Sequence, residues 1–133
     1  MRLWHIKLIS HLPRQQLLGQ HRECCALRGK GWGRNHSVVN YAFKHKPERL
    51  VVYHYLIMDE MKRRGYNPDP IWYNENWRGN ILQEQENWCD ALVVQTFYEA
   101  ITIDGCNLYP EHNDEYLREC LENLKGKGIE IQL

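Results

Sequence analysis

Residues 47–65, PERLVVYHYLIMDEMKRRG, carry the clearest structural signal in this chain of 133 residues. Apolar side chains recur there at spacings of three and four, which is the period of a helix with one buried face. These positions are Leu50, Val51, His54, Ile57, Met58 and Met61. Bases near the end of the segment complement the helix dipole before Gly65. The segment predicts a helix from Pro47 to Arg64, with His54 as a satisfied core histidine.

Helical signals also precede this segment. Pro13 is typical of a first helical turn, because its missing N–H would be unpaired there anyway, and Gly29 is typical of a helix end. We therefore expect a helix from about Pro13 to Arg28. Residues 1–10 are apolar without a clear period and fit either a strand or an extended arm. Residues 36–45 fit a short helix or a buried loop segment.

After residue 65 the pattern alternates between loop and helix. Residues 66–80 are rich in Pro, Asn and aromatic side chains and predict an ordered crossing loop. A helix is expected over residues 81–101, although its β-branched run ALVV is less typical of helices. A last helix is expected from an Asn113 cap to Gly126, and residues 129–133 fit a tail or a short edge strand.

Length and composition are those of one domain. A chain of this size, 43% hydrophobic, buries one core comfortably and two poorly. The elements together predict a mainly α fold: a single compact domain over residues 1–133, with about four helices packed side by side and long ordered loops. The sequence has no apolar run of the roughly 20 residues that span a bilayer and no secretory signal. We expect a monomeric cytoplasmic protein, at most associated with a bacterial nucleoid, without membrane contact.

The formal net charge of zero conceals a division of the chain. Residues 1–50 hold ten Lys or Arg against two Glu, a net of +8, and the remainder has a net of −8. Such asymmetry indicates a polyanionic partner, since bases that neutralise phosphates supply most non-specific affinity for nucleic acid. The alternative is that the two halves neutralise each other across the fold.

Residues 15–33, QQLLGQHRECCALRGKGWG, hold the candidate chemistry. Gly19 lies one helical turn before Glu23, so it is expected to leave space for a substrate above the carboxylate. Arg22 is the natural phosphate partner, because a guanidinium is always charged and binds pairs of oxygens. The alternative for both charged residues is an ordinary surface ion pair.

A basic, glycine-rich loop follows this helix. Lys30 and Arg34 supply charge, and Trp32 either stacks on a base or wedges a duplex, or else anchors the loop on the core. The GxGxG spacing follows a helix instead of a strand, so it does not predict a dinucleotide site.

The cysteines predict neither disulfides nor a metal site. The chain has five cysteines, an odd number, and no CxxC pair, so reduced thiols are the simplest interpretation. His21, Cys24 and Cys25 fall within one helical turn, but a structural zinc site normally shows four ligands in spaced pairs. We expect no metal and no other cofactor.

Several of these features resemble the pyrimidine-dimer DNA glycosylase family of the endonuclease V type. The resemblance is carried by the distance of Arg22 and Glu23 from the N-terminus and is supported by further short segments over residues 1–80. These are Ser10, Leu12, Gln15 and Leu17, the run HSVVNYAF, the helix ending EMKRRGY, and WRGN at 77–80. The last predicted helix is similar to the family's last helix, after a probable insertion over residues 81–108.

The resemblance implies a compact all-α, metal-independent enzyme that bends double-stranded DNA containing a lesion and flips out a base. In that family the free N-terminal amine attacks C1′ of the sugar and forms an imine. The glutamate that Glu23 matches assists cleavage of the glycosidic bond and the later β-elimination. An α-amine suits this role, because its reference pKa of about 7.7 to 8.0 leaves part of it neutral near pH 7.

Three departures from the family pattern concern the mechanism. Arg2 stands where the family has a small residue and normally blocks removal of the initiator methionine. Either Met1 carries the reacting amine, with Arg2 in place of the family's arginine, or the lyase chemistry is lost. Ala26 occupies a second basic position, for which Arg28 is the expected substitute. The family's aromatic C-terminal tail has no counterpart in this sequence, so the sequence does not identify the lesion that is recognised.

The sequence therefore predicts a DNA glycosylase with associated abasic-site lyase activity, with a non-catalytic nucleic-acid-binding module as the alternative. The predicted catalytic residues are Met1 and Glu23. The predicted DNA-binding residues are Arg2, Gln15, Arg22, Arg28, Lys30, Trp32, Arg34 and His36.

Overall fold

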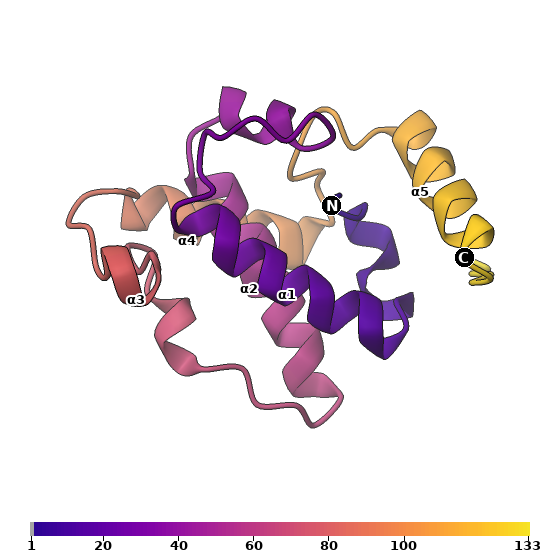
Figure 1. Ribbon diagram of the computed structural model, residues 1–133, viewed down its shortest axis with the longest axis horizontal. Helices are drawn as coiled ribbons and strands as arrows, with labels where there is room; N and C mark the ends of the chain where they lie inside the picture. Colours follow the sequence, from indigo (N-terminus) through magenta and orange to yellow (C-terminus); the bar gives the residue numbers. More distant parts are fainter. Residues whose placement is uncertain (1) are drawn as a thin grey trace.

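Helix α2 (Glu48–Arg63) forms the centre of the molecule, as described by a computed structural model of residues 2–133. Most of its side chains are buried, and the apolar stripe predicted from the sequence lies among them. Helix α1 (Arg14–Arg28) packs across it, and α4 (Ala91–Asp104) packs on another side. Figure 1 shows α1 and α2 crossing in the middle, with α3 and α5 at opposite edges. The core is thus built around one helix.

Shorter helices complete the fold. A 3-10 helix, η1 (Ile6–His11), precedes α1, and two more, η2 (Asn40–Lys44) and η3 (Pro70–Tyr73), lie in the connections on either side of α2. Helix α3 (Gly79–Leu82) is a single turn. Helix α5 (Asp114–Gly126) is capped by the Asn113 side chain, which accepts a hydrogen bond from Tyr116 N at 2.9 Å. The prediction of a mainly α protein is confirmed.

The predicted helix over residues 81–101 is wrong in its first half. The backbone leaves the helical region at Gln83 and Asn87, whose φ angles are +56° and +64°. Helix α4 begins only after Asp90, whose carboxylate caps the free N–H groups of Leu92 and Val93. A side-chain cap of this kind starts a helix because it satisfies donors without an intrahelical partner.

The predictions for the chain ends hold only in part. Neither a strand nor an extended arm forms over residues 6–11, where η1 buries Leu8 and Ile9. Residues 129–133 are a tail, and no strand occurs in residues 2–133. Residues 36–45 contain the 3-10 helix η2, and residues 66–80 are an ordered loop containing η3, close to expectation.

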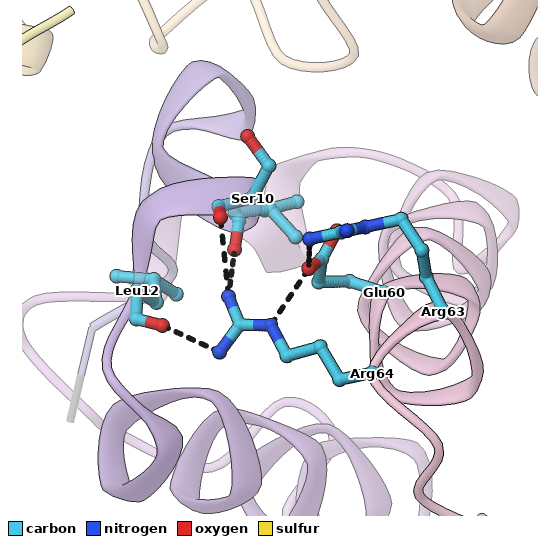
Figure 2. Close-up of polar contacts among 6 residues, drawn as sticks. Ser10, Leu12, Glu60, Arg63 and Arg64 are labelled. Carbon is cyan, nitrogen blue, oxygen red and sulfur yellow. Dashed lines mark hydrogen bonds and ion pairs between the residues drawn. The ribbon is translucent and has the colours of Figure 1, made fainter.

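Arg64, just after α2, ties the start of the chain to this central helix. Its guanidinium donates to the backbone oxygen of Leu12 at 2.7 Å and of Ser10 at 3.2 Å (Figure 2). The buried Glu60 carboxylate accepts from Arg64 at 2.7 Å and also pairs with Arg63. This network fixes the turn between η1 and α1, so it orients the helix that carries Glu23.

Within residues 2–133, none of the helices is both long enough and apolar enough to cross a membrane.

Candidate active site

The Glu23 carboxylate lies at a small pocket between four parts of the chain. The pocket has a volume of about 190 Å³. Its walls come from the N-terminal segment, α1, the loop before η2 and the end of α5, through Arg2, Trp4, Glu23, Val38, Asn123 and Lys127. Burial raises the pKa of the Glu23 carboxyl, while the charges of Lys127 and Arg22 and a hydrogen bond from Gln20 oppose that rise. The site thus holds a carboxylate whose pKa is raised by burial and lowered by nearby cations.

One buried amide connects Glu23 to the N-terminal segment. Gln20 is 1% exposed, and its Nε2 donates to Glu23 Oε2 at 2.9 Å. On its other side, Gln20 Oε1 accepts from the backbone N–H of Trp4 at 2.8 Å. The Tyr53 hydroxyl on α2 lies 2.7 Å from both Gln20 Oε1 and the Trp4 carbonyl oxygen. Sequence reasoning did not identify Gln20, because its partners come from three separate segments.

Helix α5 holds the N-terminal segment from the opposite side. The Tyr116 hydroxyl donates to the Leu3 carbonyl at 2.6 Å. The Arg2 side chain pairs with Glu119 at 3.4 Å and lies over the Tyr116 ring, and Lys127 lies over the Trp4 ring. The segment from Arg2 to Trp4 is therefore clamped beside Glu23. Met1, the predicted nucleophile, lies outside the described residues.

The open surface expected above Gly19 is partly covered. A side chain at Gly19 would meet the guanidinium of Arg22 at 3.7 Å, so this arginine reaches back over the glycine. Arg22 itself is exposed, and no ion pair joins it to Glu23 in the described part of the chain. Access to the carboxylate comes from the pocket beside the N-terminal segment instead, and Arg22 remains free to contact a phosphate.

The position of Arg28 opposes the prediction that it contacts DNA. Its side chain is fully buried. The guanidinium donates to the carbonyl oxygens of Trp72 and Asn74 at 2.7 Å and of Trp77 at 3.1 Å, and it lies over the Trp72 ring. A buried arginine needs such acceptors because its charge cannot be lost. Arg28 therefore fixes the crossing loop. It does not replace the basic residue that the family has at the position of Ala26.

The glycine-rich loop presents charge while its tryptophan packs inward. Lys30 and Arg34 are exposed, as is Gln15 on α1, and His36 is half-buried. Trp32 meets Phe43 and Trp88 edge-on, with ring centroids 5.0 and 5.7 Å apart. The structure therefore favours the alternative in which Trp32 anchors the loop on the core.

The basic half of the chain is not neutralised by the acidic half. Among residues 2–133, the Arg2–Glu119 and His45–Glu111 contacts are the only ion pairs between the two halves. The remaining exposed bases of the first half have no carboxylate partner in that range and lie on several elements: Lys7, Arg14, Arg22, Lys30, Arg34, Lys44 and Lys46. These exposed bases are thus available to a polyanion.

Three side chains of types that bind metals lie together between α1 and α2. The ligand atoms of His21, Cys25 and His54 are within 4.8 Å of one another, and His21 Nδ1 lies 2.8 Å from His54 Nε2. Cys24, which the sequence grouped with His21 and Cys25, is buried outside this cluster. His54 Nδ1 lies 2.9 Å from Arg28 Nη1, and arginine can only donate, so His54 Nδ1 accepts and its Nε2 carries the proton.

That arrangement opposes a metal ion. A metal on His54 Nε2 would require the ring to lose both protons or Arg28 to give up a buried hydrogen bond. Ligating histidines normally donate their second nitrogen to an acceptor, whereas here that nitrogen faces a donor. Burial lowers the pKa of His54 well below its usual value, in keeping with a neutral ring. The cluster is best described as a structural hydrogen-bond chain.

Fold and site together define a helical protein with a carboxylate and two cations gathered beside its N-terminal segment. The family model described as pyrimidine dimer DNA glycosylase matches residues 1–74, more than half of the chain, and the protein belongs to that DNA-repair glycosylase family. The resemblance inferred from Arg22 and Glu23 is thereby confirmed. No curated protein and no solved structure matches the chain. The matched segment contains Glu23 and every predicted DNA-binding residue but not α3, α4 or α5.

Proposed function

We propose that this protein excises a damaged base from duplex DNA and then cleaves the strand at the resulting abasic site. The nucleophile is the N-terminal amine, and Glu23 transfers the protons. The observation that carries the proposal is the position of Glu23. Its carboxylate lines a pocket that the N-terminal segment also lines, and it is linked to the backbone of that segment through Gln20.

The reaction divides into two balanced stages. The amine attacks C1′ as the glycosidic bond breaks, and the base leaves with the bonding electrons and takes up a proton. The amine loses its proton and the sugar ring opens, which gives an imine. A carboxylate at the position of Glu23 then accepts a C2′ proton, the C3′–O bond breaks, and the phosphate leaves. Water hydrolyses the imine and frees the amine.

The surroundings of Glu23 suit these steps. Trp4 and Val38 offer apolar surface to an extruded nucleotide, and Arg2 and Lys127 offer charge to its phosphates. Exposed Arg22, Lys30 and Arg34 extend the basic surface along the DNA.

Borohydride trapping tests the proposal directly. Duplexes containing a cyclobutane pyrimidine dimer, an abasic site or no lesion are incubated with the protein and the reductant. We expect a covalent adduct on one of the damaged duplexes and strand nicking without the reductant. Glu23→Gln should slow the nicking by about 10³-fold, whereas the matched change Glu122→Gln on the exposed side of α5 should leave it intact. Intact-mass measurement then identifies whether Met1 or Arg2 bears the amine.

The absence of any adduct and of any nicking on every damaged duplex would reject the enzyme. If affinity for DNA then still falls steeply with salt concentration, the protein is a non-catalytic nucleic-acid-binding module. Nicking at the wild-type rate in Glu23→Gln would instead reject the role of Glu23.

A further inference from the structure

Gln20 stands between the two parts of the proposed catalytic site, and its orientation is determined by its neighbours. The backbone N–H of Trp4 can only donate, so the Gln20 atom that faces it at 2.8 Å is the amide oxygen. The amide NH₂ group must then face Glu23, where Nε2 lies 2.9 Å from Oε2. The amide cannot turn over without losing both contacts.

The surroundings leave Gln20 little freedom. Its side chain is buried, and the fully buried Tyr53 places its hydroxyl 2.7 Å from Gln20 Oε1. Tyr53 is on α2, Gln20 is on α1, and Trp4 belongs to the N-terminal segment. A single amide thus joins the central helix, the helix of the carboxylate and the backbone near the chain start.

We propose that Gln20 is a positioning residue, which fixes the Glu23 carboxylate relative to the N-terminal segment and presents a hydrogen-bond donor to its ionised form. The proposal rests on the proposed function for its role in catalysis, but the hydrogen bond itself can be tested without it. Gln20 does not line the pocket, so it acts on the reaction only through Glu23.

Other charged groups also act on Glu23. Among the described residues, Arg22 on α1, Arg2 in the N-terminal segment and Lys127 at the end of α5 face it or share its pocket. The charges of Lys127 and Arg22 favour the carboxylate form, against the effect of burial, and Arg2 is a third cation at the pocket. Gln20 differs from them because it is neutral and buried, so its contribution should not depend on salt concentration.

The sharpest variant is Gln20→Glu. A glutamate keeps an oxygen for the Trp4 N–H and for Tyr53, and it replaces only the donor that faces Glu23. The matched control is Gln16→Glu, which adds the same charge one turn earlier on α1, where the side chain is half-buried and makes no such contact. Gln20→Met is the second variant, because it removes the donor without adding charge.

Carboxyl-carbon NMR of Glu23 during a pH titration measures the effect directly. We expect its titration midpoint to rise by about one pH unit or more in Gln20→Glu and Gln20→Met, because an ionised carboxylate loses a donor and, in the first variant, gains a like-charged neighbour. The Gln16→Glu control should move it by less than about 0.3 unit. An unchanged midpoint in both Gln20 variants would overturn the inference, whether or not the protein is an enzyme.

Single-turnover nicking provides the catalytic readout. If Gln20 acts through Glu23, the acid limb of the pH–rate profile should move to higher pH by the same amount as the NMR midpoint. At pH values on the acid side of that limb, the rate should fall about tenfold. Combining Gln20→Glu with Glu23→Gln should lower the residual rate no further. Losses that multiply in the double variant, or a uniform loss at all pH values, would show a general structural role instead. If the wild-type protein does not nick any damaged duplex, the proposed function is rejected. The NMR titration would then still test the hydrogen bond between Gln20 and Glu23.

Discussion

Two faces of helix α1 both carry polar residues, but these residues have different roles. On one face, His21, Cys25 and Arg28 are packed against α2 and the crossing loop, and we call this the Arg28 face. On the other, Gln20 and Glu23 lie beside the N-terminal segment and a pocket, and we call this the Glu23 face. On the Arg28 face, both terminal nitrogens of the Arg28 guanidinium have acceptors within the protein, and only its Nε is without a partner among the described residues. The Glu23 face keeps a carboxylate half-buried, with cations around it.

The difference teaches that charge and proximity in the sequence do not identify a binding residue. Arg22 and Arg28 are six positions apart on one helix, yet Arg22 is exposed and Arg28 is fully buried. The second arginine has four acceptors inside the protein and the first has none among the described residues. The acceptors decide the role, and they come from residues far along the chain.

The largest expected effect is on stability at the Arg28 face. Arg28→Met removes a buried fork and leaves the carbonyls of Trp72, Asn74 and Trp77 without donors. We expect the free energy of unfolding to fall by about 4 kcal/mol, a large share of a domain's total. Urea denaturation measures this. Arg28→Lys should recover little of the loss, since an ammonium cannot reproduce the planar fork. A variant of wild-type stability with weakened DNA binding would restore Arg28 to the interface.

The next effect is on rate at the Glu23 face. Glu23→Gln should slow nicking by about 10³-fold, within the range of general acid–base groups. Burial raises the pKa of this carboxyl, so its ionisation costs folded-state stability as the pH rises through the acid range. The variant should therefore be as stable as wild type at pH 7, or more stable by up to about 1 kcal/mol. If Glu23→Gln lowered the free energy of unfolding as well as the nicking rate, the Glu23 face would be structural like the Arg28 face.

A pH effect separates the faces further. Burial lowers the pKa of both His54 and His21, so the unfolded chain binds protons that the folded protein does not. Stability from these rings is present above the unfolded value of about 6.5 and is lost as the pH falls below it, at up to about 1.4 kcal/mol per pH unit for each ring. Urea midpoints between pH 7.5 and 5 measure the slope. His54→Gln keeps an acceptor for Arg28 and should reduce that slope by about one proton.

The smallest expected effects concern the exposed loop. Lys30→Ala and Arg34→Ala should each weaken DNA binding a few-fold and lower the slope of log affinity against log salt by about one. Lys62→Ala at the C-terminal end of α2 is the control, since it removes an exposed base outside that loop. Fluorescence anisotropy with a labelled duplex measures both quantities. An equal response to all three variants would show that no particular surface binds DNA.

Local chemistry was enough to predict several elements. The spacing of apolar residues in α2, the Asn113 cap of α5 and the glycine after α1 act within a few residues, so the sequence displays them directly. The break at residues 83–90 was missed because the apolar residues on its two sides were assigned to one helix across the polar run 83–87, whereas Asp90 caps a helix that begins only after it. Periodicity alone does not locate such a boundary.

For the site, the sequence by itself determined the family, through Arg22 and Glu23 at their distance from the N-terminus, and the basic character of the first half. Only the tertiary structure decided that Arg28 is internal, that Trp32 anchors its loop, and that Gln20 joins Glu23 to Trp4. Those outcomes depend on partners in segments far apart along the chain. A side chain acquires its role from the acceptors and charges that folding brings to it, and these are settled only when α1, α2 and α5 have packed.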